Sequence, residues 1–281
     1  MTNQKAKLHT TDLINCFLFL ILVSGIPAPN AFSEDRQVDG NIALVRQWLE
    51  STVSADISRG APLLSEAITV HESGKTAVVS PEQRIKQIQE RQQQYGKGSF
   101  HQLELFGQGD KVVAIYSLQR AKGPISAVQI FKVVNSKIEE IWAQPVRSGV
   151  LWKWDAEITG DKDPDANTRV FRRWYDEIYH NANWQLVPKV AGPTFIRHED
   201  REFQMTGEEY SLRLKALFSF TGGGPIEYQV IAGADKVAVI GKQGPSDFVQ
   251  AWRVRHGKLV ESWWAGVTEA DYNLQLPKTT K

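Results

Sequence analysis

The sequence predicts an α+β protein made of two copies of one unit, and three observations support this class. Each copy is about 100 residues long, the size of a domain rather than of a solenoid repeat. In each copy, amphipathic helical patterns come first and apolar strand patterns follow, which is typical of an α+β domain. Four blocks recur in the same order: 45–51 with 171–177, 80–83 with 206–209, 110–113 with 235–238, and 128–142 with 249–263.

Each copy is expected to begin with an amphipathic helix. Apolar residues recur at helical spacing over 41–58 in the first copy and over 168–182 in the second. A short strand follows each helix and ends near His71 in the first copy and near His198 in the second.

A capping box marks the start of a second helix in each copy. Ser80 is followed three residues later by Gln83, and Thr206 by Glu209. In this arrangement the hydroxyl accepts a hydrogen bond from the N3 amide, and the longer side chain reaches back to the cap amide. Pro81 suits the first helical position, where the N–H that it lacks would have no partner.

The rest of each copy is expected to form an antiparallel sheet. Two dipeptides suited to two-residue hairpin turns, Asn135-Ser136 and His256-Gly257, separate the last two strands of each copy. The predicted strands are 103–106, 112–118, 128–134 and 138–142 in the first copy, and 227–231, 236–241, 248–254 and 259–264 in the second.

The segment between the copies is rich in Gly, Pro and Asp and is predicted to be a linker. Its Trp152 and Trp154 indicate that it packs against a domain. The predicted divisions are a first domain at 41–146, a linker at 147–167, a second domain at 168–267 and a C-terminal tail at 268–281.

Residues 1–33 are expected to be a secretory signal peptide. Lys5 precedes the apolar run 13–23, and small residues near Ser33 provide a cleavage site. A membrane-spanning helix needs about 20 apolar residues, so this run is too short to be an anchor. Cys16 lies inside the run, whereas a lipoprotein cysteine would follow it. The sequence predicts an exported protein, periplasmic or secreted, that is free of the membrane after cleavage.

Charge and composition argue against several kinds of partner. The 281 residues include 33 Lys and Arg and 32 Asp and Glu, for a formal net charge of +1. Binding to nucleic acid or to an anionic membrane needs clustered cationic charge, so neither is expected. The single cysteine excludes a disulfide framework and a cysteine-based metal site. The histidines lack metal-ligand spacing, and no metal and no cofactor are expected.

The closing hairpins carry one recurring pattern. Its residues are Phe248, Trp252, Gly257, Lys258, Glu261 and Trp263 in the second copy, and Val128, Phe131, Ser136, Lys137, Glu140 and Trp142 in the first. With the order of helices and strands, this pattern resembles the SnoaL-like branch of the nuclear-transport-factor-2-like superfamily over nearly all of both copies. The resemblance implies a cone-shaped α+β barrel in each domain: a curved antiparallel sheet around N-terminal helices, with an apolar pocket at one end. It also implies an intramolecular pseudo-dimer formed through the sheets, and leaves a homo-oligomer open.

Two features of the family are replaced here. Trp48 and Trp174 stand where relatives carry a tyrosine in the first helix, and core packing is the expected role of both. Ala143 and Trp264 stand where SnoaL-like cyclases carry an acid/base aspartate. Neither alanine nor tryptophan can transfer a proton, so cyclase chemistry of that type is not expected.

His198, Glu261 and Asp200 are the candidate catalytic residues. The resemblance to ketosteroid-isomerase-like relatives implies a base near His198, and an imidazole can accept and return a proton near neutral pH. The same histidine could instead be a turn residue bonded to a backbone carbonyl. Glu261 shares a strand face with Trp263 and could be a buried base, or it could pair with an arginine such as Arg253.

Aromatic and histidine side chains are the candidate ligand-binding residues. Pocket-lining aromatic side chains suit a flat apolar ligand, whereas the same side chains on a sheet face would bury an interface equally well. Asp110 and Asp235 are expected to be solvated residues of hairpin turns. The candidate ligand-binding residues are Trp48, His71, Trp174, His198, Trp252 and Trp263.

Fold resemblance alone does not identify a function. The favoured hypothesis is an exported protein that binds a small apolar or aromatic molecule in a cone, mainly that of the second domain, with the first domain as its structural partner. The alternatives are a cofactor-independent isomerase, lyase or hydrolase that uses His198 as acid and base, and a non-catalytic structural pseudo-dimer.

Overall fold

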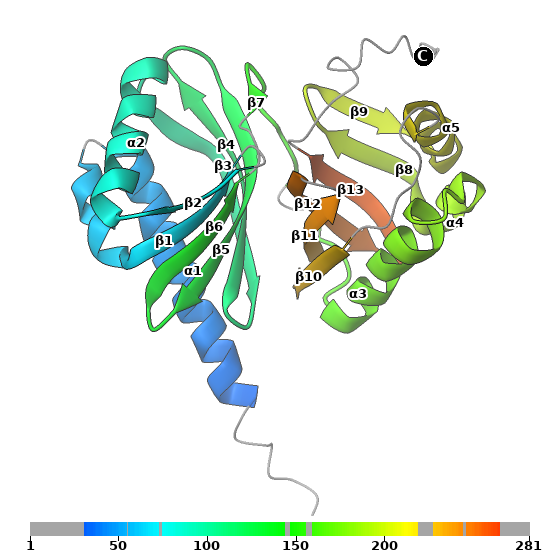
Figure 1. Cartoon of the computed structure of the whole chain (residues 1–281). Coiled ribbons are helices and arrows are strands. Elements are labelled where there is room, and N and C mark those ends of the chain that lie inside the picture. Colours follow the sequence, from blue (N-terminus) through cyan, green and yellow to red (C-terminus); the bar gives the residue numbers. More distant parts are fainter. Residues whose placement is uncertain are drawn as a thin grey trace, which may run out of the picture. The chain divides into compact units, whose positions relative to one another are not determined.

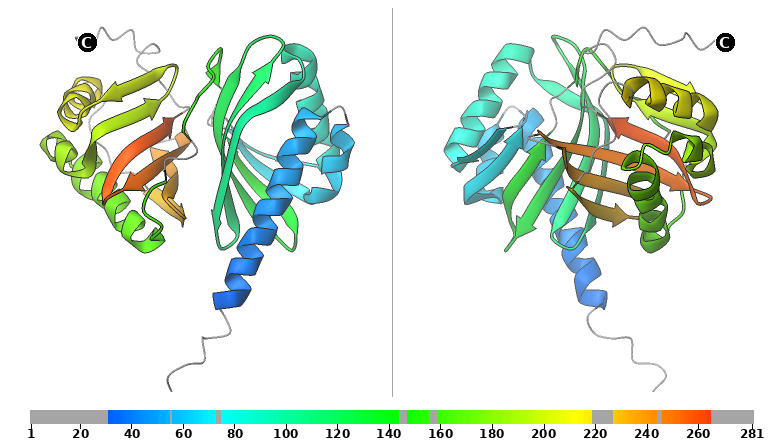
Figure 2. Two further views of the ribbon diagram at one scale, coloured as in Figure 1. Left: turned by 180° about the vertical axis from the view of Figure 1, so that it is seen from behind. Right: turned by 45° about the vertical axis from the view of Figure 1, so that its right-hand side comes forward.

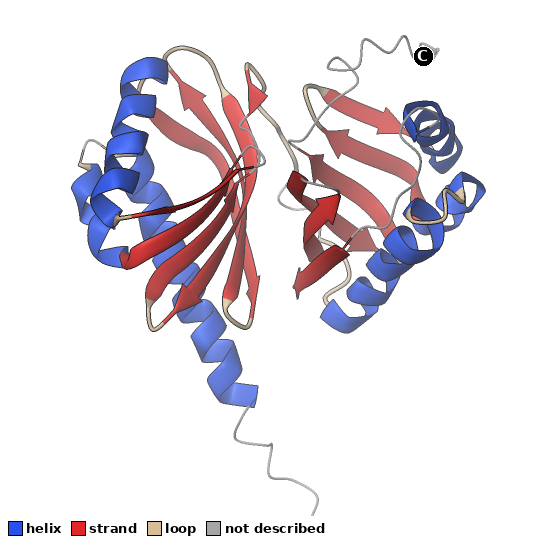
Figure 3. Cartoon of the chain, in the orientation of Figure 1, coloured by secondary structure: helices blue, strands red, loops and turns tan. Residues whose placement is uncertain are grey.

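The described chain consists mainly of two separate sheets and of the helices that cover one face of each sheet (Figures 1 and 3). The structure is a computed structural model, and it describes residues 31–54, 56–72, 75–143, 147–155, 159–218, 227–243 and 246–264. Residues 1–30 of the expected signal peptide and the whole expected tail, 268–281, lie outside these ranges. None of the helices in these ranges is long and apolar enough to span a membrane.

The first domain has two helices, one 3₁₀ segment and seven strands within the described residues. In chain order they are α1 Ala31–Val53, η1 Ile57–Leu63, β1 Leu64–Glu72, β2 Lys75–Val79, α2 Pro81–Tyr95, β3 Gly98–Gln108, β4 Lys111–Arg120, β5 Ile125–Val134, β6 Lys137–Ala143 and β7 Arg147–Ser148.

The second domain repeats this arrangement with more helical segments before its first strand. In chain order they are α3 Pro164–Arg172, the π-helical η2 Arg173–Tyr179, the 3₁₀ segment η3 Trp184–Leu186, α4 Val187–Val190, β8 Ala191–His198, β9 Glu202–Met205, α5 Gly207–Phe218, β10 Glu227–Gly233, β11 Lys236–Gln243, β12 Ser246–Arg255 and β13 Lys258–Trp264. Figure 2 shows α3, α4 and α5 on one side of the second sheet.

The two sheets have the same strand order. It is β2-β1-β6-β5-β4-β3 in the first domain, where β7 also pairs with β5, and β9-β8-β13-β12-β11-β10 in the second. Each strand therefore occupies the same place as its counterpart in the other copy. The predicted α+β class with two tandem units is confirmed by this match.

Two details of the predicted sheets are wrong. Each sheet is mixed rather than antiparallel, because β1 pairs in parallel with β6 and β8 pairs in parallel with β13. Each sheet also stays open, with two edge strands, so neither closes into a barrel. The edge strands β2 and β9 were not predicted, because they are short and largely exposed and lack an apolar pattern.

The predicted local signals at helix starts and hairpin turns are confirmed. Ser80 accepts a hydrogen bond from the Gln83 amide at 3.3 Å, while Gln83 accepts one from the Ser80 amide at 2.9 Å. Thr206 and Glu209 make the same reciprocal pair at 3.2 and 2.7 Å. Both hairpin turns have positive φ at their two central residues, as a two-residue turn of this kind requires: Asn135 and Ser136, and His256 and Gly257.

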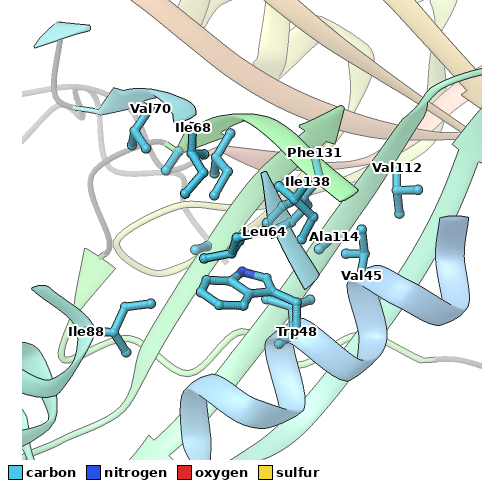
Figure 4. Packing of buried hydrophobic residues seen from close by; sticks show 14 of the residues in the cluster. Val45, Trp48, Leu64, Ile68, Val70, Ile88, Val112, Ala114, Phe131 and Ile138 are labelled. Carbon is cyan, nitrogen blue, oxygen red and sulfur yellow. The ribbon is translucent and has the colours of Figure 1, made fainter. Parts of the chain in front are cut away.

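Each domain has its own core between helices and sheet. In the first domain, Trp48 of α1 is 2% exposed and packs with residues such as Leu64 and Phe131 (Figure 4). In the second domain, Trp174 of η2 is 3% exposed and belongs to a cluster that includes Trp252 of β12. The face of each sheet that contributes to these cores is called the inner face below.

A third apolar cluster involves the opposite, outer faces of the sheets. It contains Phe106 and Val113 of the first domain, Ala251 and Trp263 of the second, and the linker residues Trp152 and Trp154. Both sheets belong to one compact unit of the chain. Trp152 and Trp154 are 2% and 7% exposed, so the linker packs against the domains.

The capping box at Ser80 gives a first testable prediction. We expect Ser80→Ala to lower the free energy of unfolding by about 1 kcal/mol, because the Gln83 amide loses its acceptor. Urea denaturation followed by circular dichroism measures this change. Ser99→Ala, at an exposed position of β3, is the control and should change stability by less than about 0.5 kcal/mol. Equal effects of the two substitutions would contradict the capping role.

Candidate functional site

The last hairpin of the second domain carries different chemistry on its two faces. Successive residues of a strand point to opposite faces of a sheet. In the register of β12 with β13, Trp252 lies opposite Ser262 on the inner face, and Arg253 lies opposite Glu261 on the outer face. The sequence candidates Trp252, Glu261 and Trp263 are therefore divided between two environments.

On the outer face, the structure brings His198 and Glu261 together. His198 Nε2 lies 2.8 Å from Glu261 Oε1, and the two side chains are 1% and 6% exposed. The imidazole stacks on Trp263, with ring centres 5.6 Å apart and an interplanar angle of 13°. Its Nδ1 has no hydrogen-bond partner among the described residues and lies 3.7 Å from Glu202. The dyad is thus buried among aromatic and acidic side chains.

Glu261 also belongs to a buried row of charges. Lys236, Arg253 and Glu261 are neighbours across β11, β12 and β13, and Arg253 forms an ion pair with Glu261. Asp235 joins Lys236 at 2.7 Å and Arg253 at 3.1 Å. Glu104 of the first domain forms an ion pair with Lys236 and lies 3.7 Å from Arg253. The alternative that Glu261 pairs with Arg253 is the one that the structure shows.

The prediction that Asp235 is a solvated turn residue is wrong. Asp235 is 8% exposed, so it is not a solvated turn residue. Burial raises the pKa of its carboxyl group. The hydrogen bond and charge of Lys236, together with the Gly160 amide and Arg253, lower this pKa by a larger amount. The result is a pKa below the usual value. Its counterpart Asp110 contacts Lys111 at 2.9 Å and has a side chain that is 40% exposed.

The first domain carries a more exposed version of the dyad. His71 Nε2 lies 2.7 Å from Glu140 Oε1, and His71 stacks on Trp142 with ring centres 5.3 Å apart. The two acid-base side chains are 16% and 24% exposed. His71 Nδ1 lies 2.9 Å from Thr76 Oγ1 and 3.7 Å from Asp247 of the second domain. The dyad is therefore a duplicated feature of the outer faces.

The position of the dyad limits what it can do. Trp263, on which His198 stacks, belongs to the outer cluster, whereas Phe195 and Arg197, the inward residues of β8, contact Tyr210 of α5. A proton held on His198 therefore lies on the opposite side of the sheet from a molecule inside the cone. Asp200 follows β8, and its Oδ1 is buried without a hydrogen-bond partner among the described residues.

The inner face of the second domain is strongly aromatic. Trp252 is fully buried, with its ring centre 4.7 Å from Phe171 and 5.9 Å from Tyr175. Trp174 stacks on Tyr210 at 5.4 Å and 7° between planes. These residues come from β12, α3, η2 and α5, so helices and sheet together build an aromatic core.

Several polar atoms lie within this aromatic surface. Trp252 Nε1 and Ser262 Oγ are buried and have no hydrogen-bond partner among the described residues. Tyr175 donates to Gln250 Oε1 across a long 3.5 Å. Burial raises the pKa of Tyr175 well above its usual value, so this hydroxyl stays protonated at neutral pH. The inner face thus offers two unused donors and one weakly used donor.

The charged groups of a second inner polar cluster are already paired. Arg197 forms an ion pair with Glu199 and donates to the Tyr210 hydroxyl at 2.7 Å. Arg213 reaches the other oxygen of Glu199 at 2.8 Å. Burial lowers the pKa of Arg197, but the charge of Glu199 raises it by more, so the guanidinium stays charged. This cluster connects β8 to α5 through hydrogen bonds and ion pairs.

The inner face of the first domain lacks the unused donors of the second at the matching positions. Phe131 lies opposite Ile141 in the register of β5 with β6, where the second domain has Trp252 opposite Ser262. Trp48 belongs to the apolar cluster around these residues. The two copies have therefore kept one fold while their interiors differ in polarity.

Sequence reasoning missed Ser262, Gln250 and Tyr175. A lone serine in an apolar strand carries no motif, and its inward orientation depends on the register of the final hairpin. The one available signal was the alternation of β13, in which Ser262 separates the outward residues Glu261 and Trp263. Within the described residues, no group of three or more His, Cys, Asp or Glu side chains is arranged to hold a metal ion.

Comparisons with known proteins find similarity in solved structures. No family model and no curated protein matches the chain. An NTF2-like protein of unknown function from Cytophaga hutchinsonii aligns with 37% of this chain and 87% of its own, at 15% identity and a TM-score of 0.31. A proposed polyketide cyclase from Pseudomonas putida aligns with 37% and 89%, at 13% identity and 0.32. A proposed ketosteroid isomerase from Kribbella flavida aligns with 43% and 94%, at 14% identity and 0.34.

The unequal burial of the two dyads predicts unequal effects of neutralising their carboxylates. We expect Glu261→Gln to destabilise the protein by about 3 kcal/mol or more, because it breaks a buried ion pair and removes one of the two carboxylates bonded to Arg253. Glu140→Gln, at the half-buried equivalent, should cost less than about 1 kcal/mol. Urea denaturation of both variants measures the difference. Equal losses would show that burial does not set the strength of the pair.

The lowered pKa of Asp235 predicts a dependence of stability on acid. Because the folded-state pKa is below the unfolded value of about 4, the contribution of Asp235 is complete above that value. It is lost as the pH falls through the lower folded-state pKa. Thermal unfolding midpoints measured across the acid range should therefore fall less steeply for Asp235→Asn than for the parent protein. Asp110→Asn, at the more exposed equivalent, is the control and should follow the parent curve.

Proposed function

We propose that the second domain binds a small, flat, apolar molecule that carries a hydrogen-bond acceptor, held between its helices and the inner face of its sheet. The observation that carries this proposal is the pair of buried, unused donors, Trp252 Nε1 and Ser262 Oγ. They lie opposite each other in adjacent strands and share the inner face. A carbonyl or ether oxygen is the complementary group.

Buried donors that stay unpaired destabilise the free protein. A buried polar group without a partner costs about 1–3 kcal/mol. A ligand oxygen between Trp252 and Ser262 would remove this cost, and the rings of Phe171 and Tyr175 would contact its apolar body. The matching positions of the first domain are Phe131 and Ile141, which favours the second domain as the binding domain.

We propose that the first domain supports the second as an internal structural partner. The outer apolar cluster, with Phe106 on one side and Trp263 on the other, supports this role. So do the ion pair of Glu104 with Lys236 and the hydrogen bond from the Ala232 amide to Gln108 at 2.9 Å. These contacts resemble an interface core, where aromatic side chains gather and charges are paired.

A binding protein is favoured over an acid-base enzyme by the orientation of His198. The imidazole faces the outer cluster and Glu261, away from the proposed ligand. Its 1% exposure also leaves it little contact with solvent. The apolar run at 13–23 supports export of the protein, as proposed from the sequence.

Two bicyclic probes of equal size test the proposed ligand chemistry. 1-Tetralone carries a ketone oxygen, and tetralin lacks it. By isothermal titration calorimetry we expect 1-tetralone to bind with a dissociation constant below about 1 mM, and tetralin about tenfold more weakly, because one hydrogen bond is worth about 1 kcal/mol.

Substitution of the serine tests the location. Ser262→Ala should weaken 1-tetralone binding about five- to tenfold while leaving tetralin unchanged, because only the ketone uses the hydroxyl. Ser117→Ala is the matched control, since Ser117 Oγ is also buried and unpartnered among the described residues but belongs to the first domain. Absence of binding by both probes, or the same affinity in the Ser262→Ala protein, would contradict the proposal.

A further inference from the structure

A group of three arginines lies between α2 and the inner face of the first sheet. Arg84 and Arg91 are seven residues apart on α2, which places them on one face of the helix. Arg120 ends β4 and shares a strand face with Tyr116, four residues before it. Tyr116 belongs to the inner core cluster, so this face of β4 is directed toward the helices.

Two of these guanidinium groups have unused hydrogen-bond donors. Arg84 is 4% exposed, and its Nε has no partner among the described residues. Its Nη1 donates to Gln87 at 3.1 Å and lies 3.7 Å from Glu72. Arg120 Nε is likewise buried without a partner in the described part of the chain. Burying an unpaired donor on a charged group is costly, so these atoms call for an acceptor.

Space for Arg120 is provided by a glycine on the neighbouring strand. A Cβ atom on Gly98 of β3 would lie 2.7 Å from Arg120 Cγ, closer than two carbon atoms can approach. The absent side chain at Gly98 therefore leaves room for the stem of the Arg120 side chain. The backbone pairing of Gly98 with Arg120 holds this arrangement.

The charges of this group do not balance. Glu72 is bound by Arg91 at 2.7 and 2.8 Å and is the carboxylate that faces Arg84. Among the described residues, no carboxylate lies within ion-pair distance of Arg120. Burial lowers the pKa of Arg84, which Glu72 raises and Arg91 lowers again. Arg84 and Arg91 thus share one carboxylate, and the positive charge of Arg120 adds to the excess.

The surroundings of the arginines are apolar and aromatic. Tyr116 is 5% exposed and packs edge-on against Phe100, with ring centres 5.8 Å apart. Ile88 and Leu118 contribute to the same core cluster. Burial raises the pKa of Tyr116 to about 12, so its hydroxyl remains a donor at neutral pH. Cationic donors and apolar walls therefore meet at one place.

The second domain provides an internal contrast. Glu199 follows His198 as Glu72 follows His71, yet there Arg197 is paired with Glu199 and with the Tyr210 hydroxyl. Tyr210 stands four residues after the capping Thr206, at the place that Arg84 occupies after Ser80. Duplication alone therefore does not require a buried arginine at this position.

We propose that the first domain binds a small organic carboxylate with an apolar body, the carboxylate held by Arg84, Arg91 and Arg120 and the body by the apolar surface around Phe100 and Tyr116. The planar guanidinium fork matches the two oxygens of a carboxylate. A bound carboxylate supplies acceptors for the unused Nε–H groups and reduces the excess of positive charge. This site is separate from the proposed ligand site of the second domain.

Calorimetry with matched probes tests the ligand class on the whole protein. We expect benzoate to bind with a dissociation constant below about 1 mM, and benzamide, its uncharged equivalent, at least about tenfold more weakly, because the charge-assisted bonds are lost. Inorganic phosphate should also bind more weakly than benzoate, because it has no apolar body. Phosphate binding as tight as that of benzoate would contradict the organic-acid assignment, and absence of benzoate binding would contradict the site itself.

Variants of the arginines test the location. Arg120→Gln and Arg84→Met should each weaken benzoate binding at least about tenfold, since each removes a charged donor. Arg46→Gln, at an exposed position of the same domain, should leave it unchanged. Ser262→Ala should also leave it unchanged, which keeps this result distinct from the test of the second domain. If Arg84→Met does not fold, Arg120→Gln alone decides the question.

A stability measurement separates a binding role of Arg84 from a structural one. If Arg84 is only partly compensated by Glu72 in the free protein, Arg84→Met should not lower the thermal midpoint without ligand, because a buried charge is replaced by an apolar side chain of similar length. It should also abolish the rise in midpoint that benzoate causes in the parent protein. A large drop in the midpoint together with unchanged benzoate affinity would overturn the proposal.

Discussion

Each sheet packs against an apolar cluster on both of its faces. This is possible because successive residues of a strand point to opposite faces of the sheet. In the last hairpin of the second domain, Arg253 and Glu261 face outward into a paired row of charges, while Trp252 and Ser262 face the aromatic interior. A slip of one residue in this register would exchange the two sets and place an ion pair in the aromatic core. The outer ion pair therefore fixes the register that positions the inner donors.

The architecture could be predicted from the sequence, but the face of the sheet on which each side chain lies could not. The duplication, the capping boxes and both hairpin turns are local patterns with a direct physical cause, and the structure contains each of them. The edge strands β2 and β9 escaped prediction because their short sequences are not visibly strand-like. The pairing of β1 with β6 joins residues far apart in the sequence, and no local signal specifies such a contact.

Some residues of the candidate sites could be predicted from the sequence, and others could not. The sequence suggested His198 and Glu261 as candidate catalytic residues, and they lie 2.8 Å apart, but their orientation toward the outer face depends on tertiary packing. Ser262, Arg84 and Arg120 had no motif to identify them. Their importance comes from unmet hydrogen bonds, which appear only once the surrounding backbone is in place. Chemistry that arises from an absent partner cannot be read from residue types.

The parallel pairing of the first and last strands has a consequence for how each domain forms. β8 cannot complete its hydrogen bonds until β13 has been synthesised, and the dyad that joins them spans 63 residues of chain. Such distant closure costs chain entropy before it brings any stabilisation, so it is a slow step. During synthesis the first domain can finish its own closure while the second is still incomplete. The outer apolar face of the completed first sheet is then available for the second domain to pack against as it forms.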